Sequence, residues 1–156
     1  MTATLKAMPS DRLSAGNSAP AACGKPLSRN RRSGPAPKTC ATLKSRLPFE
    51  YRFQQSIVSG QAMVAIPPDL TVERENQRVA GIPPGALSFL VRDEPVLVPD
   101  EIYIAYGIFI SRGLTIDAKQ PVNVFAQIDE GLEDLKAIGA RIIHHGSEMV
   151  RFSLAE

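Results

Sequence analysis

The stretch Ile102-Tyr103-Ile104-Ala105-Tyr106-Gly107-Ile108-Phe109-Ile110 is the longest apolar run of the chain and decides its fold. In an extended strand, successive side chains point to opposite faces of the sheet. Tyr103, Ala105 and Phe109 then share one face, while isoleucines and Tyr106 share the other, so neither face is polar. The stretch therefore predicts a central strand that needs cover on both faces.

Shorter strands are predicted on either side of this run. Residues 49–58 alternate between apolar and polar side chains, Ser59-Gly60 is a turn signal, and residues 61–66 read as the partner strand of a hairpin. Further short strands are predicted at residues 86–91, 96–98 and 122–128.

The end of the chain predicts one helix and two strands. Asp129 can cap a short helix over residues 131–138 that Gly139 stops. Residues 140–145 and 149–154 follow as strands around a turn at Gly146-Ser147. The fold class predicted is α+β, mainly β: a compact sandwich or partial jelly roll with one short helix.

Charge and composition both change near residue 48. The first 48 residues hold nine Lys and Arg against one acid, Asp11, while the remainder hold nine basic residues against fifteen acidic ones. All nine aromatic residues lie from Phe49 onwards, and the first segment is rich in proline. Such a segment offers little apolar surface to offset the entropy of ordering. We therefore expect a disordered basic arm at residues 1–48 and a single β-rich domain at residues 49–156.

The basic arm carries the candidate binding residues. Arginines at close spacing can contact several phosphates, each through a planar fork of donors. Basic tracts are unspecific, so an import signal and an inert solubilising tail stay open as alternatives. The residues expected to bind nucleic acid, with RNA favoured, are Lys25, Arg29, Arg31, Arg32, Lys38, Lys44 and Arg46.

No enzyme is predicted, because the parts of a catalytic site are missing from the sequence. It has no glycine-rich phosphate loop, no Gly-x-Ser-x-Gly elbow and no cysteine after residue 48. His144 and His145, as neighbours on a strand, would point to opposite faces and read as exposed or core-edge residues. The acidic clusters match no regular calcium loop. We expect no catalytic residue, metal, cofactor or small-molecule substrate.

The two cysteines, Cys23 and Cys40, both fall within the predicted arm. They lack nearby histidines for a zinc site, and we expect them to be reduced thiols. No apolar run reaches the ~18 residues of a membrane span, so none is expected.

Three stretches resemble small plant-virus coat proteins of the brome and cucumber mosaic type. They are Ser28 to Ser33, which looks like the basic arm, residues 66–76, and the helix, strand, turn and strand order of residues 132–154. In that family the arm binds packaged RNA and the shell domain makes the subunit contacts. The resemblance implies a structural protein of the virion.

Residues 122–154, with Gly131-Leu132-Glu133-Asp134-Leu135 at their centre, are similar instead to the β-α-β half of subtilisin-type protease propeptides. That resemblance implies a module that binds a protein. The two readings belong to different functional classes.

The leading hypothesis is a non-enzymatic structural protein whose arm binds nucleic acid and whose body self-associates. Tyr103 and Phe109, on the less aliphatic face of the central strand, are expected near the contact between subunits. The alternative is an organelle-targeted or protein-binding interaction module. A virion or the cytoplasm is the favoured location, with organelle import through residues 1–48 as the alternative.

Overall fold

The structure is a computed structural model that describes residues 2–8, 18–23, 36–93, 99–113, 118–128 and 130–154. For residues 2–8 and 18–23 it describes the backbone alone. The predicted strand at residues 96–98 and the predicted cap Asp129 lie outside these ranges.

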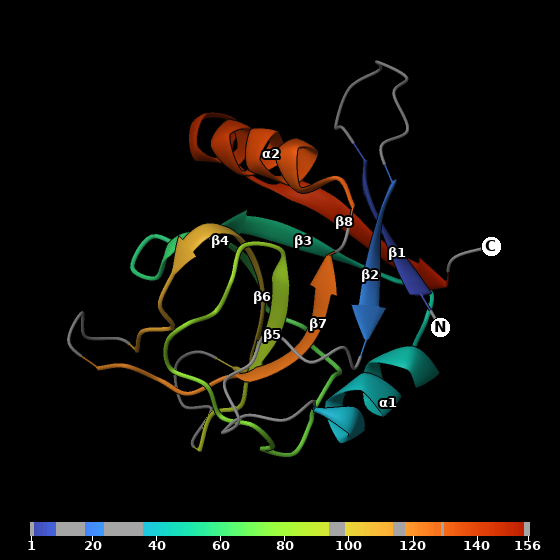
Figure 1. The fold of residues 1–156 in the computed structure, drawn as a ribbon, viewed down its shortest axis with the longest axis vertical. Helices are drawn as coiled ribbons and strands as arrows, with labels where there is room; N and C mark the ends of the chain where they lie inside the picture. Colours follow the sequence, from blue (N-terminus) through green and yellow to red (C-terminus); the bar gives the residue numbers. More distant parts are fainter. Residues whose placement is uncertain are drawn as a thin grey trace.

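The fold is mainly β with two helices, and its antiparallel sheet curls into a closed barrel (Figure 1). Six strands run in the order β8 (Glu148–Leu154), β3 (Phe49–Gln55), β4 (Gly60–Ala65), β6 (Glu101–Phe109), β5 (Ala86–Leu90) and β7 (Asn123–Ile128). β1 (Thr2–Met8) pairs with β8 and β2 (Ser18–Cys23) pairs with β7, and together they close the barrel. The predicted α+β, mainly β class is confirmed.

The predicted central strand is confirmed, since β6 lies between β4 and β5 and is buried on both faces from Glu101 to Tyr106 and again at Phe109, although Ile108 near its end is exposed. Ile102, Ile104 and Tyr106 belong to the main core, which includes side chains of both helices. Tyr103 and Phe109 belong to a second core on the other face. Ile82, from the segment between β4 and β5, contributes to the cover of that face.

The helix α2 (Leu132–His145) lies across one end of the barrel and extends beyond the predicted stop at Gly139 (Figure 1). The strand predicted at residues 140–145 is therefore wrong. Gly139 lets the helix pack closely against the ring of Tyr106, because a Cβ added to this glycine would lie 2.5 Å from Cδ1 of Tyr106. The helix ends at Gly146, whose positive φ of 95° suits glycine.

The helix α1 (Pro37–Ser45) lies within the predicted arm but belongs to the folded body (Figure 1). Thr39, Cys40 and Leu43 of this helix are buried, so the body begins before residue 49. Cys40 is disulfide-bonded, and the expectation of a reduced thiol is wrong for this residue. Proline at the first helical position suits the start of a helix, where its missing N–H has no partner to lose.

A carboxylate distant in sequence caps α1. Glu75 accepts hydrogen bonds from the backbone N–H groups of Lys38 and Thr39, at 2.9 and 2.7 Å, and from Oγ1 of Thr39 at 2.6 Å. These groups would otherwise lack partners in the first turn. Burial alone would raise the pKa of Glu75, but the hydrogen bonds from Thr39 and Lys38 leave that pKa below its usual range.

The buried amide of Asn123, at the start of β7, connects this cap to the barrel. Its Nδ2 donates to Oγ1 of Thr39 at 3.0 Å and to the carbonyl of Glu73 at 2.6 Å. Its Oδ1 accepts from the backbone N–H of Glu75 at 2.8 Å and from Nε2 of Gln77 at 2.7 Å. One fully buried side chain therefore joins β7, α1 and the segment that follows β4.

Replacement of Asn123 by Ala is expected to lower the free energy of unfolding by about 3 kcal/mol, since each buried group left unpaired costs roughly 1–3 kcal/mol. Denaturant unfolding followed by circular dichroism would measure the loss. Glu73→Ala is the matched control: it keeps the carbonyl that Asn123 binds and removes only an exposed ion pair with Lys38. An Asn123→Ala variant as stable as Glu73→Ala would contradict the role given to this amide.

Candidate functional site

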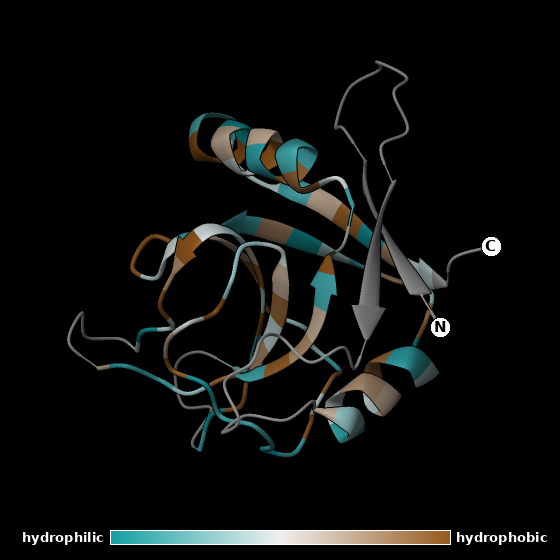
Figure 2. Ribbon diagram, viewed as in Figure 1, coloured by the Kyte–Doolittle hydropathy of each residue, from teal (hydrophilic) through white to brown (hydrophobic). Residues whose placement is uncertain are grey.

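Four large hydrophobic side chains are exposed together at one corner of the barrel. The described residues include five such side chains, and four of them are Ile57, Val58, Ile108 and Ile143, exposed by 90%, 45%, 79% and 55%. We call these four the apolar corner. The fifth, Ile66, follows the other end of β4. In Figure 2, apolar colouring marks the turn after β3 and the C-terminal end of α2.

Backbone contacts bring the turn after β3 close to the end of β6. Gly60 pairs with Phe109, and a Cβ added to Gly60 would lie 2.5 Å from the carbonyl oxygen of Ile108. The register of β4 and β6 shifts between Gly60 and Ala62, and the side chain of Gln61 accepts a hydrogen bond from the N–H of Ile108 at 2.9 Å. The exposed isoleucines of the turn and of β6 are thus held on neighbouring backbone.

An open groove of about 590 Å³ runs beside the corner, between the end of β3 and the last turn of α2. Ile57 and Ile143 line it together with the buried Ile142, and its polar lining comes from Gln54, Gln55 and Ser147. Gln55 is fixed: its Nε2 donates to the carbonyl of Gly60 at 2.8 Å, and its Oε1 accepts from the hydroxyl of Tyr106 at 2.7 Å. The groove therefore has fixed polar groups beside exposed isoleucines.

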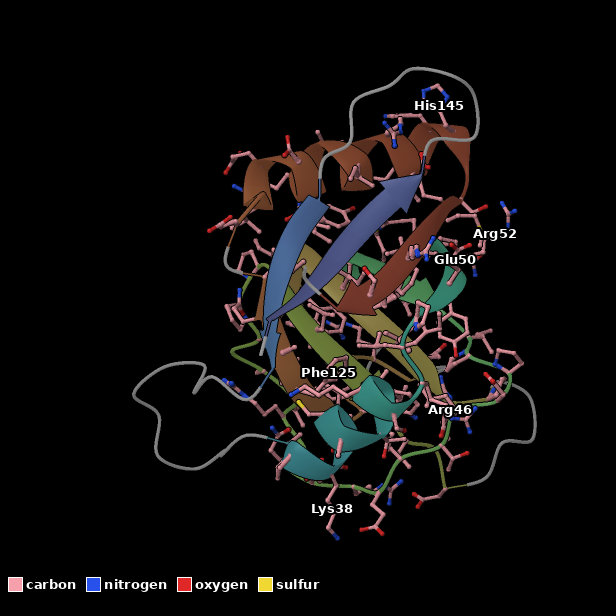
Figure 3. All side chains as sticks on the ribbon, turned by 90° about the vertical axis from the view of Figure 1, so that its right-hand side faces the viewer. Lys38, Arg46, Glu50, Arg52, Phe125 and His145 are labelled. Carbon is pink, nitrogen blue, oxygen red and sulfur yellow. The ribbon has the colours of Figure 1, made fainter. Side chains whose placement is uncertain are left out.

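Basic and imidazole side chains surround this end of the barrel. Arg52 donates to Oγ of Ser147 at 3.1 Å, and the exposed His144 and His145 end α2. Arg141 is bonded to the buried Glu148 at 2.8 Å. Figure 3 shows His145 at the α2 end of the molecule and Lys38 at the α1 end. Of the side chains named at this end of the barrel, four carry N–H donors and only Glu148 carries a carboxylate.

A second polar group of side chains lies buried on the outer face of β6. Arg92 and Glu101 form an ion pair at 2.9 Å with only 12% of each side chain exposed, and Tyr103 donates to the same carboxylate at 2.6 Å. Arg92 also donates to Oε1 of Gln120 at 3.1 Å. The network ties the segment after β5 to β6 and to the segment before β7.

The buried Tyr103 is held as a hydrogen-bond donor. Burial raises its pKa above the usual range, and the negative charge of Glu101 raises it further. The phenol therefore stays protonated at neutral pH and donates its proton to the hydrogen bond with Glu101. We assign the network with Arg92 and Glu101 a structural role.

The predicted nucleic-acid residues fall into two groups. Lys25, Arg29, Arg31 and Arg32 lie outside the described residues. Lys38, Lys44 and Arg46 lie on or next to α1, where Lys38 pairs with Glu73, and Arg46 pairs with Asp69 at 3.2 Å. Two of the three cations on α1 are thus already paired with carboxylates of this chain.

The predicted self-association residues lie inside the molecule. Tyr103 and Phe109 are each 3% exposed, and their ring centroids lie 5.1 Å apart within the second core. The cover for this face of β6 comes from the same chain, so Tyr103 and Phe109 are not exposed for a contact between subunits.

His144 and His145 are neighbours on a helix, not on the strand that the sequence predicted. Among the described residues, no three His, Cys, Asp or Glu side chains gather closely enough to hold a metal ion. None of the described helices is both long and apolar enough to cross a membrane.

The apolar corner is not predicted by the sequence pattern. The alternation predicts a strand over residues 49–58, which would include Ile57, but β3 ends at Gln55 and a turn follows. One signal in the sequence could have indicated it. The turn residues Ser59-Gly60 directly follow Ile57 and Val58, so these two apolar residues can belong to the turn itself.

Comparison with known proteins gives a family and a fold. Residues 32–154 match the model of a family described as "Protein of unknown function (DUF3830)". The chain belongs to the DUF3830 family. No curated protein sequence matches this DUF3830 chain significantly.

The DUF3830 chain is similar in structure to McbB, solved in complex with tryptophan, with a TM-score of 0.65 and 13% sequence identity. The match covers 97% of this chain and 44% of the McbB chain, and at this identity it shows a shared fold alone. Neither comparison bears on the resemblances to plant-virus coat proteins or protease propeptides, which stay predictions.

All three tyrosines of the chain are expected to resist ionisation in the folded state. Burial raises the pKa of Tyr51 to about 12, helped by its hydrogen bond to Asp69. Burial also raises the pKa of Tyr103 and of Tyr106. In the unfolded chain each phenol titrates near pH 10. The tyrosines therefore stabilise the fold below about pH 10, and this contribution is lost as pH rises through the folded pKa values.

A titration of tyrosinate absorbance would check this expectation, with the chain in denaturant as the control. The folded protein should show little tyrosinate at pH 10, where the denatured control is half ionised. Full ionisation near pH 10 with the circular dichroism spectrum unchanged would contradict the burial of these side chains.

Proposed function

We propose that the chain is a non-enzymatic interaction protein whose apolar corner docks against an apolar surface of another polypeptide. The supporting observation is that four of the five exposed large hydrophobic side chains in the described residues come from neighbouring segments: Ile57 and Ile143 line one groove, and the turn that carries Ile57 and Val58 adjoins the backbone of Ile108. Single exposed hydrophobic residues are normal on protein surfaces, but a contiguous patch marks an interaction site.

The surroundings of the corner fit a protein interface. Protein interfaces combine an apolar centre with a polar rim that supplies hydrogen bonds. Here Ile57 and Ile143 form the apolar part, while Gln54 and Ser147 line the adjoining groove. Gly60 and the side chain of Gln61 hold the backbone on which Ile108 is exposed.

Site-specific photo-crosslinking in cells that produce the chain would test docking at the corner. A photoreactive phenylalanine derivative placed at position 57 or 108 is expected to give adducts with a defined polypeptide identified by mass spectrometry. The same derivative at position 66 is the matched control, since Ile66 is 45% exposed but lies at the other end of β4, about 20 Å away.

Ile143→Asp should remove these adducts, because it places a carboxylate in the apolar contact without disturbing a buried side chain. Its melting temperature should stay close to that of the unchanged protein. Equal adduct formation at positions 57, 108 and 66, or adducts that persist in Ile143→Asp, would overturn the proposed function.

Nucleic-acid binding by the basic residues of the first segment is the second candidate. It is supported by the excess of nine basic residues over one acid in residues 1–48. Ion pairing with phosphates releases counterions, so such binding weakens steeply as salt rises.

Replacement of Arg29, Arg31 and Arg32 by Ala should weaken binding to random single-stranded RNA and reduce the slope of log affinity against log salt by about 2. The matched control is Lys38→Ala with Arg46→Ala, whose side chains already pair with Glu73 and Asp69. Fluorescence anisotropy over a series of salt concentrations would measure both. An unchanged slope in the triple variant would rule out this use of the three arginines.

A further inference from the structure

The exposed side of α2 lies next to the apolar corner, to which this helix contributes Ile143. Leu135, Gly139 and Ile142 are the buried residues of the helix. Glu133, Ala137, Ala140 and His144 are exposed at spacings of four, three and four residues, which places them on one outward stripe. Ile143, a member of the corner, flanks this stripe.

Charge is distributed unequally along this outward side. Its N-terminal end carries Glu133 and Asp134, with Glu133 83% exposed although bonded to Lys136. Its C-terminal end carries His144 and His145, whose ring N–H groups are donors for a carboxylate, and Arg141, whose Nε already donates to Glu148. A second α2 helix running antiparallel would bring each acidic end against the donor end of the other copy.

We propose that the partner at the apolar corner is a second copy of this chain, packed α2 against α2 about a two-fold axis. The proposal rests on the proposed function, because Ile143 belongs to both surfaces. An interface of this kind uses the same patch on both copies, so every contact occurs twice.

The geometry of two antiparallel helices determines which residues of the two α2 helices face each other. With the axis between Ala137 and Ala140, the small side chains let the two helices approach closely. Glu133 of each copy then faces His144 of the other, and Asp134 faces Arg141. Ile143 lies against the partly buried Leu132 of the other copy, which removes an exposed isoleucine from water on each side.

The helix alone is too small for a stable interface, so the proposed contact includes the adjoining apolar corner. α2 has 14 residues and is about 21 Å long. Stable interfaces bury on the order of 800 Å² per partner. Ile57, next to Ile143 in the groove, extends the apolar surface beyond the helix.

A charge swap on the full-length chain tests the proposal. Light scattering and sedimentation over a range of concentrations should show a dimer for the unchanged protein. Glu133→Lys and His144→Glu should each weaken dimerisation on the order of tenfold, because the two-fold axis repeats each altered contact. The double variant Glu133→Lys with His144→Glu should restore the dimer.

If the double variant dimerises again, residue 133 of one copy has to contact residue 144 of the other copy. Within one helix the two positions are eleven residues and about 16 Å apart, too far to interact. Glu73→Lys, an exposed charge reversal on the segment that caps α1, is the control and should leave dimerisation unchanged. Thermal melting of every variant would confirm that the fold is kept.

The outcomes separate this inference from the proposed function. A chain that stays monomeric at all concentrations, or a double variant no better than the single ones, would overturn the α2 dimer. If the corner then still forms crosslinks to a different protein, the proposed function stands. If no adduct forms at the corner and Ile143→Asp still dimerises, both fail.

Discussion

A strand without a polar face imposes the arrangement of the whole molecule. β6 offers Ile102, Ile104 and Tyr106 on one side and Tyr103, Ala105 and Phe109 on the other, so most of each side has to be removed from water. The curled sheet and the two helices enclose the first side. The second side is covered by segments between strands, and the buried pair of Arg92 and Glu101 is tied to that cover.

The segments that cover this side have little regular secondary structure, so side chains take part in hydrogen bonds that a neighbouring strand would otherwise make. Asn76 exchanges two hydrogen bonds with the backbone of Val124, each at 2.8 Å, as a neighbouring strand would. Asn123 and Glu75 then attach the start of α1 to the same place. Buried amides and carboxylates of this kind fix one arrangement, because any other leaves them without partners.

Elements with a strong local pattern were predictable from the sequence. The alternation in residues 49–58 predicts a strand whose first seven residues form β3, and the apolar run at residues 102–110 corresponds to β6 within one residue at each end. α1 was missed because its composition is polar and its cap, Glu75, lies 36 residues away from Thr39. Gly139 was read as a helix stop because its actual reason, contact with the ring of Tyr106, is tertiary. The apolar corner was hidden for a similar reason: Ile57 has the residue type of a core position, and only the end of β3 at Gln55 exposes it.

The position of β8 between β1 and β3 bears on how the chain folds. Among the described strands, β8 comes last in sequence and pairs with β1, which comes first, so this pairing has the greatest sequence separation in the described sheet. Contacts of this kind carry a large loop-closure entropy and form slowly. During synthesis, β3 has one open edge until β8 emerges, and an unpaired edge is a template for pairing with other chains. The period of synthesis before β8 emerges is therefore when the open edge of β3 can pair with other chains.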